Sequence, residues 1–326
     1  MTRTTSLRQA LRSAPPVVHD LMRGLFIYPL RLAIRFLPWP GLRLMLFNSL
    51  ADHLWWLEGH VDARTVHGST LRVDASDIVG KHLYYFGIWE PSLTEWMRRS
   101  LKPGAVVIDV GANIGYYSLL TSKLVGPGGR VIAIEALPET MQRLRFNLDR
   151  NGATNVRAIN SAAWSRVERL KIFVRQEGAS GATTLMSDWA DRWQLRRQVE
   201  IDAAPLSTLL SDSEIASARM IKIDVEGAEW EVISEMTSWL GRTAPDFEVA
   251  IEISTSMMAA QGKCFQDILE LFQGFGFFAY RVRNDYLAAS CISWRDASKP
   301  ARISAWPDEK VDQIDVVFSR TEAGYL

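Results

Sequence analysis

The sequence predicts an α/β fold built on a doubly wound, mostly parallel sheet. From Lys102 onward, strand-like apolar runs alternate with helical patterns at the spacing of βαβ units. The first of these runs, AVVIDV, is apolar without interruption, as is typical of a parallel strand covered on both faces. With 326 residues and 48% hydrophobic content, the chain is long enough to bury the core that such a sheet needs.

Residues 1–60 are predicted to form a helical extension that is both basic and apolar. Five prolines divide residues 1–40 into short helical pieces. After the last of them, apolar residues recur at the spacing of one helical face: Phe47, Leu50, Leu54 and Leu57. The first fifty residues hold seven arginines against one acid, Asp20, whereas the whole chain is neutral. The charge is therefore strongly polarised along the sequence.

Residues 61–100 are expected to lead into the main domain and to cover the active site. The stretch TVHGSTLRVD predicts a hairpin or a pair of short strands. The stretch PSLTEWMRRSL predicts a helix that begins at Pro91, because proline suits the first turn of a helix.

Residues 101–326 are predicted to form the main α/β domain. The helix YYSLLTSKLVG ends at Gly126, and the helix PETMQRLRFNLDRNG begins at Pro138 and stops at Asn151 and Gly152. The strands that follow AVVIDV are RVIAIEA, NVRAIN, MIKID, FEVAIEI, FFAYRV and QIDVVFS, and the other helices are STLLSDSEIAS, GAEWEVISEM and CFQDILELFQGF. The stretch ERLKIFV…QVEIDAAP inserts extra strand-like material after NVRAIN.

Composition excludes several classes of protein. A neutral chain lacks the basic field of a nucleic-acid-binding protein, so no nucleic acid partner is expected. Cys264 and Cys291 are the only cysteines, which argues against a disulfide framework or a cysteine zinc site and favours a cytoplasmic location. His53, His60 and His67 lack metal-binding spacing, so no metal is expected. Arginines interrupt the apolar N-terminal run, which predicts no membrane-spanning helix.

A glycine turn follows the first strand of the main domain, in the stretch VVIDVGANIGYYS. Asp109 ends the strand, and Gly111 and Gly115 let the backbone pass close to a ligand at the start of the next helix. The nicotinamide fingerprint GxGxxG is broken, because Asn113 and Tyr116 stand where its second and third glycines belong. The turn therefore argues against a nicotinamide oxidoreductase, and its acid suits a ligand with an amino-acid moiety.

A second acid, Glu135, ends the next strand, twenty residues after Gly115. A carboxylate at this position can accept hydrogen bonds from both hydroxyls of a ribose. Ligands of open α/β sheets bind outside the carboxyl ends of the strands, which is where Asp109 and Glu135 are expected to lie. The two acids and the glycine turn between them predict a ligand that contains a nucleoside.

Three stretches together resemble a known enzyme family. VIDVGANIGYYSLL, VIAIEALPETMQRLRFNLDRNG and IKIDVEGAEWEVI are similar to the three signature blocks of the FkbM-type S-adenosylmethionine-dependent methyltransferases. FGIWEP, ahead of the first block, and GATTL, at Gly181 to Leu185, are also similar to the family pattern. The resemblance covers about Tyr85 to Ile253. It implies a seven-stranded, Rossmann-like methyltransferase sheet of order 3-2-1-4-5-7-6 and the cofactor S-adenosylmethionine.

The resemblance also implies which residues hold that cofactor. Around its methionine part it places five residues: Asp109, Gly111, Ala112, Asn113 and Gly115. Glu135 would hold the ribose. Asn160 or Ser161, at the end of the third strand, would flank the adenine, although many related methyltransferases have an acid there.

Charged residues in the strand MIKID are explained by the same resemblance. In the implied order this strand lies next to the first strand, so its carboxyl end faces the reactive methyl group. Asp224 is then placed to orient an acceptor hydroxyl and to take its proton. Lys222, two residues earlier on the same face, can pair with that carboxylate and keep it ionised. Glu226 lies near the start of the next helix, where a negative charge is favourable, and Glu229 follows it.

Other residues stay open as contributors to the site. Glu252 closes the fifth strand and Glu90 lies in FGIWEP, so both are candidates for contact with the acceptor. His82 is an alternative base, although a lone histidine beside aromatic residues more often has a packing role. Conversely, Lys222 and Asp224 can be read as a structural ion pair and Glu226 as a helix-start residue.

These observations together predict an S-adenosylmethionine-dependent O-methyltransferase. The expected acceptor is a hydroxyl of a sugar, a glycan or a lipid-linked molecule. A polyketide or peptide hydroxyl of a secondary metabolite is an alternative. So is a metal-assisted enzyme with Asp224, Glu226 and Glu252 as ligands. A non-catalytic, membrane-associated module that keeps the cofactor pocket is an alternative from another class.

The basic extension has two interpretations. In one, residues 1–50 rest on the anionic inner face of a membrane, with Arg23, Arg31 and Arg35 at the headgroups and Trp39 at the interface. In the other, these helices cap the core or the partner subunit of a homo-oligomer.

Overall fold

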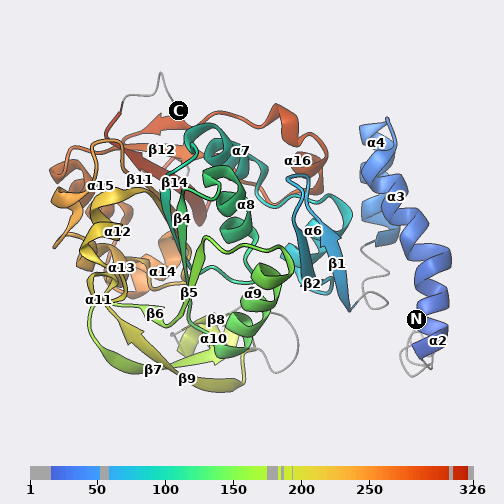
Figure 1. Ribbon diagram of the computed structural model, residues 1–326, viewed down its shortest axis with the longest axis horizontal. Coiled ribbons are helices and arrows are strands. Elements are labelled where there is room, and N and C mark those ends of the chain that lie inside the picture. The colour runs from blue at the N-terminus through green and yellow to red at the C-terminus, as the bar shows by residue number, and fades with distance from the viewer. Residues whose placement is uncertain are drawn as a thin grey trace. The chain divides into compact units, whose positions relative to one another are not determined.

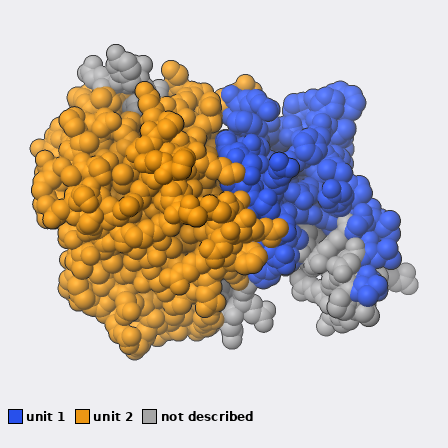
Figure 2. Space-filling view, in the orientation of Figure 1, with its two compact units in different colours: residues 1–89, 286–295 blue, residues 90–285, 296–326 orange. Residues whose placement is uncertain are grey.

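The computed structural model describes residues 16–51, 59–174, 183–184, 187–192, 194–307 and 311–321. The chain divides into two compact units, shown in different colours in Figure 2. Unit 1 comprises residues 1–89 and 286–295, and unit 2 comprises residues 90–285 and 296–326. Several residues of the sequence predictions, among them Leu54, Leu57 and His53, lie outside the described residues.

Unit 1 consists of helices and a β-hairpin (Figure 1). Its helical elements are α2 (Pro16–Met22), the π-helical η1 (Arg23–Ile27), α3 (Tyr28–Phe36), α4 (Pro40–Leu46), the π-helical η2 (Phe47–Ala51), α6 (Ile78–Tyr85) and α16 (Ala288–Ile292). The predicted hairpin is present as β1 (His60–Arg64) and β2 (Thr70–Asp74), although its first strand begins five residues earlier than expected. Helix α3 packs against α6, and α4 packs against α16.

The main sheet lies in unit 2 and has the predicted α/β class. From one edge to the other, its strands are β5 (Val156–Asn160), β4 (Arg130–Glu135), β3 (Val106–Val110), β10 (Ala218–Ile223), β11 (Glu248–Ser254), β14 (Gln313–Ser319), β12 (Phe278–Val282) and β13 (Ala301–Ile303). The first five are parallel, and β14 is antiparallel to both of its neighbours. The expectation of seven strands is corrected to eight, because β13 pairs with the edge of β12.

Helices cover both faces of the main sheet (Figure 1). The helices of unit 2 are α7 (Pro91–Ser100), α8 (Tyr116–Val125), α9 (Pro138–Arg150), α10 (Ser187–Arg192), α11 (Leu206–Leu209), α12 (Asp212–Ser217), α13 (Glu229–Met236), the short η4 (Leu240–Arg242), α14 (Thr255–Ala260) and α15 (Phe265–Gly274). Helices α8 and α9 pack on the side of β3, β4 and β5, whereas α13 and α15 pack on β11 and β12. The central strands are thus enclosed, which explains their uninterrupted apolar runs.

The extra strand-like material after β5 forms a second sheet. It has the order β6 (Ala162–Ala163), β9 (Arg197–Ala204), β7 (Glu168–Val174) and β8 (Thr183–Thr184), seen in the lower part of Figure 1. On its inner face, Ile172, Val174 and Ile201 form a small apolar cluster with Leu170 and Leu137. The predicted insertion is therefore confirmed as a separate layer with its own apolar face.

Candidate active site

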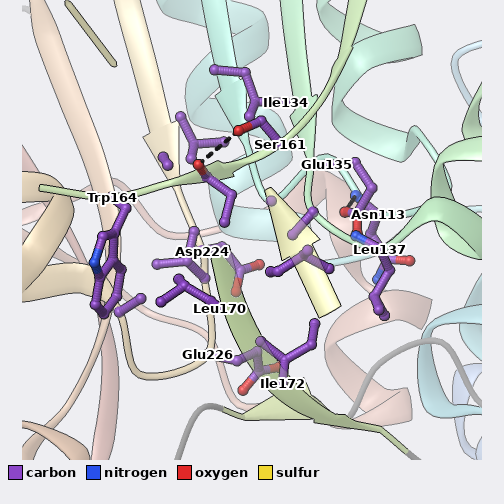
Figure 3. A pocket seen from close by; sticks show the side chains of 18 of the residues that line it. Asn113, Ile134, Glu135, Leu137, Ser161, Trp164, Leu170, Ile172, Asp224 and Glu226 are labelled. Carbon is purple, nitrogen blue, oxygen red and sulfur yellow. Dashed lines mark hydrogen bonds between the residues drawn. The ribbon is translucent and has the colours of Figure 1, made fainter. Parts of the chain in front are cut away.

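A pocket opens at the carboxyl ends of β3, β4 and β10, where the sequence predicted the ligand. Gly111, Asn113, Glu135 and Ser161 line it from one side, as Figure 3 shows for the last three. Asp224 and Glu226 line it from the loop after β10. The structure thus brings together six of the predicted site residues in one cavity.

The glycine turn after β3 has a clear steric cause. Gly111 adopts a φ of 78°, and a Cβ at this residue would lie 1.8 Å from the backbone oxygen of Asp224. The backbone N–H of Asp224 in turn donates to the carbonyl of Val110, at 3.1 Å. Any side chain at position 111 would therefore displace the loop that carries Asp224. Gly115, with a φ of 93°, lets α8 begin within contact distance of Leu144.

Glu135 occupies the pocket wall and fixes the loops on either side of it. Its Oε2 accepts the backbone N–H of Asn113, and its Oε1 accepts that of Leu137, each at 2.9 Å. Burial raises the pKa of this carboxyl to about 7, against the lowering effect of those two hydrogen bonds. Each oxygen keeps a further lone pair, so the carboxylate can also receive two ligand hydroxyls.

The structure separates the two candidates at the end of β5. Ser161 lines the pocket and its hydroxyl contacts the carbonyls of Ala162 and Asp202. Asn160 does not line the pocket, because its amide donates to the carbonyls of Glu135 and Ala136 and ties β5 to β4.

The second sheet supplies a wall that sequence reasoning missed. Leu170 and Ile172 line the pocket from β7, and Trp164 lines it from the loop after β6 (Figure 3). Ile201 lines it from β9. The alternation in ERLKIFV predicted a strand with one apolar face, but it could not show what that face covers. Only the return of β9 alongside β6 brings these side chains to the pocket.

Three other residues predicted around the cofactor lie beside the pocket without lining it: Asp109, Ala112 and Gly115. Asp109 is buried, and Ser118 donates to its Oδ2 at 2.6 Å. Its Oδ1 is buried without a hydrogen-bond partner in the described structure, and burial raises the pKa of the carboxyl. A buried acceptor without a partner costs free energy, which marks this oxygen as a position where a ligand donor is favoured.

The predicted pair of Lys222 and Asp224 is formed. Lys222 Nζ lies 2.8 Å from Asp224 Oδ2 and 4.9 Å from the centre of the Tyr117 ring. Burial opposes the charge on this lysine, yet the carboxylates of Asp224, Asp109 and Glu90 raise its pKa above the usual value. The ammonium therefore stays charged inside the unit and holds Asp224 at the pocket wall.

Glu226 lies between the pocket at the carboxyl ends of β3, β4 and β10 and a second cavity. It lines both cavities, and the second is also lined by Trp189, Glu229 and Glu252. Helix α13 begins at Glu229, so Glu226 lies near the start of this helix, three residues before its first residue. Glu226 has a left-handed backbone with a φ of 53°. Burial, with Asp224 and Glu229 nearby, raises its pKa well above the usual value.

Glu252 contributes to the same acidic surroundings. It faces Asp315 across the antiparallel pairing of β11 with β14. Burial and the carboxylates of Asp224 and Asp315 raise the pKa of Glu252 well above its usual value. Burial also raises the pKa of Asp315 to about 6, although Asn284 donates to it at 2.9 Å.

Glu90 directly precedes α7 and belongs to the same electrostatic cluster. It is buried, has a left-handed backbone with a φ of 43°, and accepts the hydroxyl of Tyr117 at 2.5 Å. Burial, followed by the charge of Asp315, raises its pKa to about 8, although Lys222 acts in the opposite direction. Sequence reasoning missed the tyrosine, whose position on α8 gave no sign of this contact.

The remaining predicted residues have other surroundings or lie outside the described parts. His82 is buried in unit 1 among Phe47, Phe86 and Trp89, and its Nδ1 lies 2.8 Å from the carbonyl of Ile78, as in a packing role. Of the GATTL stretch, only residues 183–184 are described. Among the residues that the structure describes, no three His, Cys, Asp or Glu side chains are grouped so that they could hold a metal ion.

Comparison with known proteins points to one family. The family model described as "Methyltransferase FkbM domain" matches residues 109–279, which is more than half of the chain. The chain is 29% identical over 160 residues to the 31-O-demethyl-FK506 methyltransferase FkbM of Streptomyces tacrolimicus, covering 41% of this chain and 60% of that protein.

Two further similarities are shorter or more distant. The chain is 39% identical over 90 residues to a protein-L-isoaspartate O-methyltransferase of Aeropyrum pernix, covering 28% of this chain and 29% of that protein. The match thus spans less than a third of that relative and less than two thirds of the FkbM relative. A solved structure, the methyltransferase FkbM of Methylobacillus flagellatus KT, is similar at 14% identity and a TM-score of 0.39, covering 74% of this chain and 55% of that one.

Proposed function

The chain belongs to the FkbM methyltransferase family, and on this premise we propose that it transfers a methyl group to a hydroxyl oxygen of a sugar, a glycan or a lipid-linked acceptor. The methyl donor is S-adenosylmethionine. The observation that supports oxygen as the acceptor atom is the pair of Lys222 and Asp224, which puts a carboxylate oxygen at the wall of the cofactor pocket.

The residues of the pocket fit this cofactor. Glu135 has lone pairs for the ribose hydroxyls while its loops are held by backbone hydrogen bonds. Ser161 and the apolar wall of Leu170, Ile172 and Ile201 suit a flat, weakly polar base. The partnerless buried Oδ1 of Asp109 suits the cationic amino group of the methionine part.

S-adenosylmethionine supplies an electrophilic methyl group on a sulfonium sulfur. Asp224 orients the acceptor hydroxyl and accepts its proton while the carbon–oxygen bond forms and the carbon–sulfur bond breaks. Lys222 keeps the carboxylate of Asp224 in place through its 2.8 Å contact. The main contribution of the protein is to hold the acceptor oxygen in line with the methyl group.

The second cavity is the proposed place of the acceptor. Its walls carry the carboxyl groups of Glu226, Glu252 and Asp312 and the indole of Trp189. Carboxyl groups accept hydrogen bonds from hydroxyls, and an aromatic face packs against the apolar face of a sugar ring. These surroundings disfavour anionic acceptors, because the carboxylate of Asp312 repels them and a nearby anion would oppose ionisation of Glu226 and Glu252. A neutral polyhydroxylated acceptor therefore fits this cavity better than a phosphorylated one.

Product mass spectrometry tests the proposal. The full chain is incubated with S-adenosylmethionine and glycan, lipid-linked or small-metabolite fractions, with Asp224→Asn as the inactive control. The expected result is a gain of one methyl group on a hydroxyl of a glycan or lipid-linked fraction. A methylated secondary metabolite alone would overturn the acceptor class. Cofactor binding without turnover on any fraction would favour a non-catalytic module.

A further inference from the structure

Unit 1 exposes an unusual number of large apolar side chains on its N-terminal helices. Eleven such residues lie between positions 17 and 50 and are exposed in the described structure. We call this set the apolar surface of unit 1: Val17, Val18, Leu21, Leu25, Phe26, Tyr28, Leu32, Phe36, Trp39, Met45 and Leu50. Scattered exposed apolar residues are ordinary, but a large exposed apolar patch marks an interaction site. These eleven residues follow one another along the segment of successive helical elements α2, η1, α3, α4 and η2.

Helix α3 is not an isolated helix that is exposed on all sides. Its other apolar residues, Leu30 and Ile34, are buried, as is Ile27 just before it. The helix is therefore already packed on one side within unit 1. The remaining apolar face, with Tyr28, Leu32 and Phe36 at intervals of four residues, has nothing to cover it among the described residues.

Arginines border this apolar face on α3. At about 100° per residue, Leu32 and Phe36 lie roughly 40° and 80° from Tyr28 around the helix. On the other side of Tyr28, Arg35 and Arg31 lie at roughly 20° and 60°, between the exposed face and the buried one. Long cationic side chains at such a border can reach along the helix surface toward anionic groups.

The described helices of unit 1 also gather positive charge. Arg31 Nε donates to the carbonyl of Tyr84 at 2.9 Å, and Arg43 Nε donates to the carbonyl of Ile34. Within the described residues, neither of them nor Arg35 forms an ion pair with a carboxylate. Arg31 and Arg35 are both half-buried, and Arg31 is anchored to the backbone of α6, so each keeps only part of its side chain exposed.

The arginines of unit 1 also repel one another, which agrees with a local excess of positive charge. Burial, and then the charges of Arg31 and Arg64, lower the pKa of Arg35. Burial, and then the charge of Arg295, lowers the pKa of Arg43. Each of these arginines is thus close enough to another cation to be destabilised by it. An external anion bound beside them would relieve that repulsion.

We propose that the apolar surface of unit 1 docks on an anionic phospholipid bilayer. Its apolar side chains enter the boundary between headgroups and acyl chains, while the bordering arginines contact lipid phosphates. Tyr28 and Trp39, whose rings have an apolar body and a polar group, suit that boundary. A second copy of the chain fits the charge less well, since a two-fold contact through the same surface would bring the two arginine clusters together.

This contact is peripheral. No helix in the described parts of the chain has the length and the hydropathy that a bilayer crossing requires. Because docking by a partly apolar helix combines burial with charge attraction, its strength should depend on both lipid charge and salt.

Sedimentation with vesicles tests the proposal on the full chain. One set of vesicles contains phosphatidylcholine alone, and the other contains phosphatidylcholine with phosphatidylglycerol. The expected result is a bound fraction at least several-fold higher on the anionic vesicles, falling as salt is raised. Equal binding to both sets, or binding to neither, would overturn the proposal.

Two matched substitutions separate docking from a general effect of surface charge. Phe36, 69% exposed, belongs to the apolar surface, whereas Phe146, 50% exposed, lies on α9 of unit 2. Phe36→Asp should reduce the bound fraction several-fold, and Phe146→Asp should leave it unchanged. If the two variants bind vesicles equally, the apolar surface is not the docking site. If sedimentation velocity shows a dimer that Phe36→Asp dissociates, a second copy covers this surface instead of lipid.

Discussion

Ile172 and Val174 allow a direct test of whether the second sheet holds the cofactor. They lie two residues apart on the inner face of β7, and each is 6% exposed. Ile172 lines the cofactor pocket, whereas Val174 packs only within the small apolar cluster of that sheet. The substitutions Ile172→Ala and Val174→Ala therefore both remove buried carbon atoms from the same apolar cluster. Only Ile172→Ala also removes atoms that line the cofactor pocket.

The expected magnitudes follow from the carbon atoms removed. Ile172→Ala deletes three carbons, worth about 0.8 kcal/mol each when fully buried. If about half of that surface faces the nucleoside, binding weakens by roughly 1–1.4 kcal/mol, or about five- to tenfold in Kd. Val174→Ala should destabilise the fold by roughly 1–3 kcal/mol through lost packing and leave the Kd unchanged.

Isothermal titration calorimetry with S-adenosylhomocysteine measures the Kd without requiring the acceptor. Urea unfolding of both variants provides the stability control. If Val174→Ala weakens binding as much as Ile172→Ala does, the effect arises from loosening of the second sheet. If neither changes the Kd, the second sheet does not contact the cofactor and this assignment fails.

Three further predictions concern the acidic residues of the site. Glu135→Ala should weaken binding of S-adenosylhomocysteine by roughly 1–3 kcal/mol, since it leaves ribose hydroxyls and two backbone N–H groups without an acceptor; an unchanged calorimetric Kd would contradict the assignment. Asp224→Asn should lower turnover by roughly 10²–10⁴ with the Kd little changed; near-normal turnover in the methyl-transfer assay would move the base to Glu90, Glu226 or Glu252. Burial raises the pKa of Glu229 from 4.5 to about 7 in the folded chain. Without cofactor, the contribution of Glu229 to folding stability is therefore fully present below a pH of about 4.5 and is lost as the pH rises through about 7. Urea unfolding at pH 5 and pH 8 should show this loss, and Glu229→Gln should make it smaller; an equal loss in that variant would assign the pH dependence to other groups.

Much of the fold could be predicted because its causes are local. The uninterrupted apolar run of β3 and the proline at the start of α9 act within one element. The extra edge strand β13 could not be predicted, since three residues with two exposed side chains give no periodic pattern. Its existence depends on pairing with β12, which is a tertiary contact.

The part of the site that lies at the ends of the strands could be predicted from the sequence. Asp109, Glu135 and Asp224 follow or close parallel strands, and parallel strands end at one edge of a sheet. The choice between Asn160 and Ser161 could not be made from sequence, because adjacent residues after a strand point to opposite sides and the turn decides which faces the ligand. In the structure Ser161 lines the pocket, whereas the amide of Asn160 donates a hydrogen bond from β5 to the backbone of β4.

The sequence by itself determined the α/β alternation, the glycine turn and the acids at the strand ends, because each is set by residues close together in the chain. Only the tertiary structure decided which carboxyl groups surround Lys222, since Glu90, Asp109 and Asp224 come from segments far apart in sequence. It also decided that the second sheet walls the pocket and that the arginines of α3 turn partly inward while apolar side chains face out. Those arrangements depend on which surfaces meet when the chain folds, and a pattern along one strand or helix carries no information about the surface that it will face.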